Sequence, residues 1–361
     1  MDCLEKQATM DTYIRESPKT LFRVLNEGSQ LVNQLVKLFI EEDYKKIKIV
    51  ASGSSYNASY CSKKFLENIL DISVEVVTPF TFVHYLKCDK NTFHLVISQS
   101  GSSTNSIEAL DHIRKTDSKA IGITGNLDSE LKKHCDYIID YGVGVEKVGY
   151  VTKGVVSLVL FLDLFALYAA KKLRKLEENS LEEKLREIRS LINNYSEVYE
   201  KTQRFIATNF SLLTSMHQVN LLGNGSTYAV ALEGALKIGE TVCIPSFAYE
   251  SEEFLHGPNL QLTPTYSNFI IDANDDTTPR LKEIFEAVSS VSERSFYIGI
   301  GKEDQDPKKL MIDCQVEHDL LPLVYLQVFQ SIAFQVTDSL NKWQKHPVFE
   351  KNFRGKIQYK V

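Results

Sequence analysis

The hydrophobic positions of the chain alternate between short apolar runs and longer stretches with helical spacing. Residues 2–43 have a helix-forming composition, and their last part repeats apolar pairs at the spacing of one helix face: Leu31-Val32, Leu35-Val36 and Leu38-Phe39. The character then changes. Residues 47–51 form an apolar run that stops at a turn of small residues, 52–55, before a helical pattern resumes over 56–72. This succession predicts a β-strand, a tight turn and a helix.

The same succession continues through the first half of the chain. It predicts further strands and helices, at 74–77, 94–97, 119–124 and 136–139 for the strands and at 80–86 and 104–116 for the helices. Several of these strands are apolar almost throughout, which is typical of a parallel sheet covered by helices on both faces. The most hydrophobic run, 155–170, contains Asp163 and falls short of the roughly 20 apolar residues that span a bilayer, so we expect a buried core helix there.

The second half begins after a highly charged stretch. Residues 171–200 alternate acids and bases along a sparse apolar stripe, which predicts a solvated surface helix that connects the two halves. A strand is then expected at 218–222, followed by a turn and a helix from Tyr228. Further strands are expected at 268–272 and 295–300. This half therefore repeats the alternation of strands and helices.

Two of the predicted turns align with each other. Ser52-Gly53-Ser54-Ser55-Tyr56 matches Asn224-Gly225-Ser226-Thr227-Tyr228, and each follows an apolar strand and precedes a helix. The two glycines are 225 − 53 = 172 residues apart. An offset of this size indicates duplication of a whole domain rather than a short solenoid repeat.

A length of 361 residues also favours two domains. We predict an N-terminal helical segment (1–46), a first domain (47–175), a helical linker (176–215), a second domain (216–340) and a C-terminal tail (341–361). The fold class expected for each domain is α/β, with a parallel sheet between two layers of helices.

Charge and composition narrow the class of protein. The chain is 43% hydrophobic with a net charge of -6, so broad attraction to nucleic acid or to an anionic membrane is not expected, and an anionic ligand would need a local pocket of donors. The N-terminus carries charges and no apolar core, so we expect no signal peptide. Six scattered cysteines without a C-x-x-C pair are typical of a reduced, cytoplasmic protein, and no histidine or cysteine spacing indicates a metal.

Two loops of the first half have the composition of a phosphate site. Residues 52–55 and the richer 98–104 both follow a predicted strand and precede a helix. The first N–H groups of a helix have no intrahelical partner, and serine hydroxyls and glycine let an anion approach them. The second loop has five hydroxyl residues within seven positions. The alternative is that these serines are helix caps.

These loops resemble the sugar isomerase (SIS) family. The resemblance rests on Ser98-Gln99-Ser100-Gly101, on Gly53-Ser54-Ser55-Tyr56-Asn57, and on the stretches 231–237 and 253–258 (ALEGALK and EFLHGP). It spans the chain from residue 47 onward, and its nearest members by motif are the isomerase half of glutamine–fructose-6-phosphate aminotransferase and the ketosamine-phosphate deglycases and deaminases. It implies two tandem SIS domains, each a three-layer α/β/α unit with a flavodoxin-like sheet, and no cofactor.

The resemblance also implies roles for individual residues. A phosphate cradle and substrate-binding positions would fall on Ser54, Ser55, Ser98, Gln99, Ser100, Ser103, Glu233 and Lys237. Glu240 would be the proton-abstracting carboxylate, His256 the ring-opening imidazole, and Lys356 a C-terminal lysine that closes over the sugar. Each has a structural alternative: a solvated glutamate, a histidine that holds a turn, and a Glu233/Lys237 pair that only stabilises its helix.

Departures from the family pattern limit the function. Asp2, not a cysteine, follows Met1, and about 46 residues precede the first predicted strand, so we expect no glutamine-derived ammonia from this chain. The second half has Asp272-Ala273-Asn274-Asp275-Asp276 in place of the Ser-Gln-Ser-Gly loop, so only the first half should bind phosphate.

The sequence thus predicts an enzyme acting on a phosphorylated ketosamine or amino sugar through an enolamine or enediol. Aldose–ketose isomerisation of a phosphosugar is the alternative reaction, and a non-catalytic sugar-phosphate sensor is the alternative class. Family resemblance further implies a homodimer with shared active sites. We expect no nucleic acid and no membrane as partners.

Overall fold

The computed structural model describes residues 9–144, 146–147, 149–343, 346 and 348 of the chain. Its strands form two five-stranded sheets, in which every pairing is parallel. The strands of the first sheet are β1 (Lys46–Ala51), β2 (Ser73–Val77), β3 (Thr92–Ile97), β4 (Ile121–Thr124) and β5 (Tyr137–Asp140). Those of the second are β6 (Val219–Gly223), β7 (Ser246–Glu250), β8 (Ser267–Ile271), β9 (Ser295–Ile300) and β10 (Lys309–Ile312).

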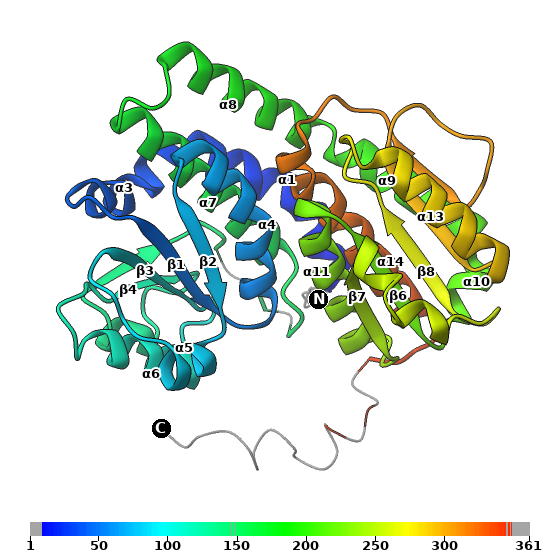
Figure 1. Ribbon diagram of the computed structural model, residues 1–361, viewed down its shortest axis with the longest axis horizontal. Helices are drawn as coiled ribbons and strands as arrows, with labels where there is room; N and C mark the ends of the chain where they lie inside the picture. Colours follow the sequence, from blue (N-terminus) through cyan, green and yellow to red (C-terminus); the bar gives the residue numbers. More distant parts are fainter. Residues whose placement is uncertain (1–8, 145, 148, 344–345, 347, 349–361) are drawn as a thin grey trace, which may run out of the picture.

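The two sheets have the same topology. The first runs β2-β1-β3-β4-β5, and the second, read from its β7 edge, runs β7-β6-β8-β9-β10. Strand by strand, the second sheet repeats the first, as the aligned turns predicted. The fold class is confirmed: two parallel α/β units stand in tandem, each with a flavodoxin-like strand order. Figure 1 shows the two sheets beside each other.

Helices cover both faces of each sheet. The helices that follow the strands of the first unit are α4 (Gly53–Leu70), α5 (Pro79–Tyr85), α6 (Thr104–Ile113), η1 (Glu130–Lys133) and α7 (Lys153–Lys172). Those of the second unit are α11 (Gly225–Thr241), α12 (Ser251–Phe254), η2 (Pro258–Gln261), α13 (Thr278–Val291), η3 (His318–Leu320) and α14 (Pro322–Ser339). The N-terminal and connecting helices are α1 (Met10–Asn26), α2 (Gly28–Leu31), α3 (Asn33–Ile40), α8 (Glu178–Asn193), α9 (Tyr195–Thr208) and α10 (Phe210–Thr214).

One core joins the two units. A continuous cluster of buried apolar side chains runs from the first sheet through α4 and α7 to α11, α14 and the second sheet. The opposite face of each sheet has a smaller cluster of its own, under α5 and α6 in the first unit and under α13 in the second. The helices α4 and α11 begin at the aligned turns and pack against each other. The start of α4 lies beside the end of α11, because Ser54 contacts Lys237 and Asn57 contacts Glu233.

Two apolar helical stretches are long enough to cross a membrane but lie in this core. They are Lys153–Lys172 and His318–Ser339, and 94% and 89% of their most apolar windows are buried inside the protein. The first extends the core helix predicted over 155–170. Burial of both stretches against the sheets accounts for their hydrophobicity.

The structure corrects part of the secondary-structure prediction. Residues 171–200 are not one surface helix: α8 ends at Asn193, α9 begins at Tyr195, and α9 buries Tyr195 and Val198 against the core. The edge strands β7 and β10 were not predicted, because both carry partly exposed, mixed residues without a clear apolar run. The domain boundaries remain predictions.

Candidate active site

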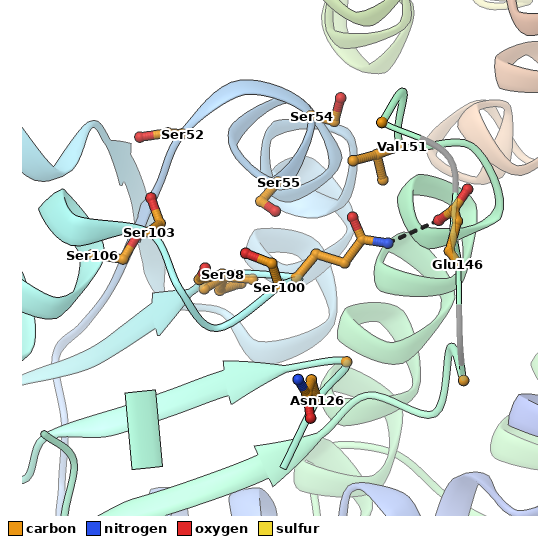
Figure 2. A pocket seen from close by; sticks show the side chains of 15 residues that line it. Ser52, Ser54, Ser55, Ser98, Ser100, Ser103, Ser106, Asn126, Glu146 and Val151 are labelled. Carbon is orange, nitrogen blue, oxygen red and sulfur yellow. Dashed lines mark hydrogen bonds between the residues drawn. The ribbon is translucent and has the colours of Figure 1, made fainter. Parts of the chain in front are cut away.

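A cavity of about 710 Å³ lies at the carboxyl end of the first sheet. It opens where the strand order reverses, between β1 and β3, which is the position at which parallel α/β sheets bind ligands. The loop after β1 supplies Ser52, Ser54 and Ser55 to its lining, and the loop after β3 supplies residues 98–100 and Ser103. Figure 2 shows the labelled serines of the two loops around the cavity, with Glu146 and Val151 on its other side.

The loop after β3 needs glycine at position 101. Gly101 has φ 66°, in the left-handed region that side chains rarely adopt. A Cβ atom there would lie 1.9 Å from the Oγ atom of Ser129. The backbone N–H of Gly101 donates to the carbonyl of Ser98 over 3.1 Å and closes the turn. This turn presents the following serines at the start of α6.

The N-cap serines of these loops do not cap their helices with a side-chain hydrogen bond. Ser52 and Ser103 are the N-cap residues of α4 and α6, and neither side chain makes a capping hydrogen bond. Ser103 Oγ instead donates to Asn105 Oδ1 over 2.7 Å, and Asn105 Nδ2 donates to Ser52 Oγ over 3.2 Å, which links the two loops. The first N–H groups of both helices are thereby left without a side-chain acceptor from the N-cap residue. Such N–H groups and hydroxyls suit a phosphate.

The second unit contributes a buried cluster of charges behind this cavity. Lys237 on α11 is 1% exposed, and its Nζ atom lies 3.2 Å from Glu233 Oε1 and 2.6 Å from Glu240 Oε1. The same ammonium donates to Ser54 Oγ over 3.0 Å, and Asn57 Nδ2 donates to Glu233 Oε2 over 2.8 Å. Both of these hydrogen bonds join α11 to α4. The cluster therefore attaches carboxylates of the second unit to the serine loop of the first.

The charge on Lys237 is maintained by its neighbours. Burial would lower the pKa of this ammonium, but the carboxylates of Glu233 and Glu240 outweigh burial and raise the pKa above its ordinary value. Lys237 is therefore a permanent cation at neutral pH. This cation lies 2.6 Å from Glu240 Oε1, the carboxylate that the sequence proposes as proton acceptor.

Nine of the sequence-predicted residues fall into three groups. Six line the cavity: Ser54, Ser55, Ser98, Gln99, Ser100 and Ser103. Glu233 and Lys237 are buried in the charge cluster next to it, so their pairing is more than a surface helix contact. Glu240 is partly exposed, belongs to the same cluster, and lines a second cavity of about 490 Å³ beside β7.

One predicted catalytic residue lines neither cavity, and another lies outside the described residues. His256 is exposed on the turn after α12 and is absent from the lining of both cavities. Lys356 lies outside the described residues. His134 and Cys135, a pair that could suggest a reactive site, are accounted for structurally: His134 Nδ1 lies 2.8 Å from Asp111 Oδ1, and burial raises the pKa of the Cys135 thiol.

The main residue that sequence reasoning missed is Glu146. It lines the cavity from the segment between β5 and α7, together with Gly144, Gly149 and Val151. Asn126, after β4, was also missed. The only sequence signal was the glycine-rich character of 142–149 directly after a predicted strand, which marks a loop at the same sheet edge.

The equivalent position in the second unit is filled by its own side chains. After β6, Asn224 Nδ2 donates to Thr277 Oγ1 over 3.3 Å; after β8, Asp272 Oδ1 accepts from Thr278 Oγ1 over 2.7 Å. Asp272 and Asp275 also place negative charge where the first unit has serines. This edge is therefore unsuited to a phosphate. Among the residues that the structure describes, no group of three or more His, Cys, Asp or Glu could hold a metal ion.

Comparison with known proteins matches this architecture to one family model, the SIS domain, over residues 42–168. Glutamine–fructose-6-phosphate aminotransferase from Clostridium tetani is 33% identical over 254 residues, which cover 68% of this chain and 41% of that protein. The chain thus spans less than half the length of this curated relative.

Solved structures share the fold over nearly the whole chain. A candidate phosphosugar isomerase from Clostridium difficile 630 superposes with a TM-score of 0.89 at 27% identity, covering 98% of this chain and 99% of that one. The C-terminal domain of glucosamine-fructose-6-phosphate aminotransferase from Francisella tularensis superposes with a TM-score of 0.82 at 22% identity, covering 94% of this chain and 98% of that one.

Proposed function

Because the chain belongs to the SIS-domain proteins and is homologous to the isomerase half of glutamine–fructose-6-phosphate aminotransferase, we propose that it is an enzyme acting on a phosphorylated ketosamine or amino sugar. In the proposed reaction an enolamine or enediol forms at C1 and C2, water hydrolyses the carbon–nitrogen bond, and the amine or ammonia is released together with a hexose phosphate. Homologues and structural neighbours support an enzyme of this family.

The observation that carries the proposal is the link between Ser54 and Glu240. Ser54 lines the cavity of hydroxyls, and Lys237 contacts both Ser54 Oγ and Glu240 Oε1. A phosphate held by the serine loops would therefore place the sugar chain within reach of a carboxylate. In the proposed mechanism Glu240 moves the proton between C1 and C2, and Lys237 stabilises the negative charge that develops on the adjacent oxygen.

A homodimer is part of the proposal. The imidazole proposed to open the sugar ring, His256, does not line the cavity of its own chain, and it lies on an exposed turn. In the dimer we propose, this turn of one subunit reaches the cavity of the other. Lys356 would close over the sugar from the C-terminal tail. We further propose a cytoplasmic location, since the substrate is a phosphorylated metabolite.

Aldose–ketose isomerisation is the second candidate reaction, and it needs the same residues. The enediol step would be common to both reactions, so the Glu240–Lys237 pair supports either one. The difference lies in whether a nitrogen substituent leaves the sugar. Substrate choice therefore has to be measured.

The test is a coupled assay of the full-length protein with a panel of phosphorylated ketosamines, amino sugars and hexose phosphates, following released amine and each hexose phosphate. We expect turnover of at least one nitrogen-bearing substrate, reduced about 100- to 10,000-fold by Glu240→Gln. Glu286→Gln, the same change at an exposed position of α13, serves as the control. Turnover that survives both Glu240→Gln and His256→Ala would contradict the catalytic assignment. Hexose-phosphate binding without turnover of any substrate would favour a sensor.

A further inference from the structure

Glu146 accepts four hydrogen bonds in the wall of the serine cavity. Its Oε1 atom accepts from the backbone N–H of Thr152 over 2.7 Å and of Lys153 over 3.2 Å. Its Oε2 atom accepts from the N–H of Gly154 over 3.1 Å and from Gln99 Nε2 over 2.8 Å, the bond drawn in Figure 2. Three of these donors stand at the N-terminus of α7, where N–H groups have no intrahelical partner.

This pattern leaves the carboxylate no spare capacity for acid–base work. An ionised carboxylate offers about four lone-pair sites, and all of them are occupied here by protein donors. A proton on either oxygen would be directed against an N–H group. Burial raises the pKa of Glu146, while the hydrogen bonds from Thr152, Gln99 and Gly154 and the charge of Lys153 oppose that rise. Glu146 is therefore suited to hold its neighbours in place.

The partner that faces the cavity is the side chain of Gln99. Because the carboxylate accepts only, the amide of Gln99 must turn its Nε2 atom toward Glu146. Its carbonyl oxygen is then directed away from Glu146, and no donor from the described residues reaches that oxygen. Gln99 lines the cavity beside Ser98 and Ser100. An acceptor at this place suits a hydroxyl group of the ligand, since a phosphate oxygen needs a donor.

Gly154 shows that this arrangement depends on close packing. A Cβ atom at position 154 would lie 2.5 Å from Gln99 Nε2 and 2.9 Å from Glu146 Oε2. A side chain there would separate the amide from the carboxylate. The glycine, the carboxylate and the amide thus form one unit between the β3 loop and α7.

We propose that Glu146 is a positioning residue for substrate recognition, which orients the Gln99 amide so that its carbonyl oxygen accepts a hydrogen bond from a sugar hydroxyl next to the phosphate. The assignment rests on the proposed phosphosugar function. The proposal gives the loop two binding roles. Serine hydroxyls and backbone N–H groups bind the phosphate, and the Gln99 side chain binds the sugar.

Calorimetric titration of the full-length protein with fructose 6-phosphate and with inorganic phosphate tests this division. In Glu146→Gln an NH₂ group replaces one carboxylate oxygen. When this NH₂ group faces Gln99, the Gln99 carbonyl oxygen turns toward it and away from the cavity. We expect fructose 6-phosphate to bind about tenfold more weakly and inorganic phosphate to bind within about twofold of the unaltered protein, as for the loss of one hydrogen bond. Gly154→Ala should also weaken the binding of fructose 6-phosphate without weakening that of inorganic phosphate. Glu183→Gln, at an exposed position of α8, should change neither affinity. Equal weakening of both ligands, or no change, would overturn the inference.

A second readout needs no sugar phosphate. The side-chain NH₂ signals of Gln99 in a ¹H–¹⁵N spectrum, identified by their loss in Gln99→Glu, should exchange slowly with water and should shift in Glu146→Gln. Unshifted, rapidly exchanging signals would overturn the positioning role. Should the unaltered protein bind neither ligand, the proposed function fails, whereas the contact between Glu146 and Gln99 is still decided by these signals.

Discussion

The ammonium nitrogen of Lys237 lies 3.0 Å from the hydroxyl oxygen of Ser54, although the two residues are far apart in the sequence and belong to different α/β units. Ser54 stands in the first turn of α4 and Lys237 near the end of α11. The contact follows from the duplication, because the helices that begin at the aligned turns pack against each other. A buried cation of one unit is thus placed at the edge of the other unit's cavity.

The buried cluster makes Lys237 important for stability. In Lys237→Met the carboxylates of Glu233 and Glu240 lose their cation, and Glu233 remains buried at 1% exposure without it. Loss of one partner of a buried ion pair costs about 3–5 kcal/mol, so we expect the free energy of unfolding in urea to fall by about 3 kcal/mol. Lys64→Met, on the exposed face of α4, should change it by less than about 0.5 kcal/mol. A similar change in the free energy of unfolding for both variants would show that the cluster contributes little to stability.

The turn at Gly101 should be required for binding of phosphate. In Gly101→Ala the new Cβ atom meets Ser129 Oγ at 1.9 Å and the backbone stays at φ 66°, so the serine loop has to move. We expect the affinity for inorganic phosphate to fall at least about tenfold, since several hydrogen bonds lose their geometry. The added change Ser129→Gly removes the two atoms nearest to the new Cβ, Ser129 Oγ and Cβ, and should restore part of the affinity. No loss in Gly101→Ala would contradict the placement of phosphate at this loop.

Only one of the two equivalent sheet edges should bind phosphate. The edge after β8 carries Asp272 and Asp275 and is bridged by Thr277. Titration with inorganic phosphate should therefore give one site per chain. Ser100→Ala should weaken it by about 0.5–1.5 kcal/mol, the contribution of one hydrogen bond, and Thr277→Ala should leave it unchanged. A second site, or sensitivity to Thr277→Ala, would be the contrary result.

Asp163 should make the protein less stable as the pH rises. Its carboxyl group lies fully buried in α7, and burial raises its pKa well above the ordinary value; the nearby acid Asp319 adds to this rise, and the Ser62 hydroxyl opposes it. The folded protein holds this proton after the unfolded chain has released it at about pH 4, so stability falls with rising pH until the raised pKa is reached.

Asp163→Asn removes this dependence. Measured by urea unfolding from pH 4.5 to 8, the variant should gain on the unaltered protein by up to about 1.4 kcal/mol per pH unit. The dependence on pH should flatten below about pH 4, where the unfolded chain also holds the proton. A difference that stays constant with pH would mean that Asp163 does not keep its proton in the folded state.

The sequence predicted the architecture well because the relevant signals are local. The strand, turn and helix around 47–72 each have their own pattern, and the repeat around Gly225 predicted a second unit, which the two equivalent sheets confirm. The strand β7 was missed because an edge strand needs no continuous apolar run. The serine loops were found from composition, since their position at a strand end is implied by the pattern alone.

The rest of the site depends on contacts between distant residues. Glu233 and Lys237 look like an ordinary i,i+4 pair, and their burial follows only from the packing of α11 on α4. Glu146 is one acid among many in the sequence, and its role depends on the N-terminus of α7 and on Gln99. His256 is exposed and lines neither cavity, so its proposed place in a neighbouring subunit's site depends on a contact between chains that a single sequence does not specify.

Formation of an enediol or enolamine is the central claim, and exchange of substrate hydrogen with solvent tests it most directly. The full-length protein is incubated in D₂O with hexose 6-phosphates and amino-sugar 6-phosphates, and deuterium at C1 and C2 is followed by NMR. The account predicts incorporation with at least one of these compounds, and its reduction by about 100-fold or more in Glu240→Gln. Absence of exchange with every compound, or exchange that Glu240→Gln leaves unchanged, would contradict it.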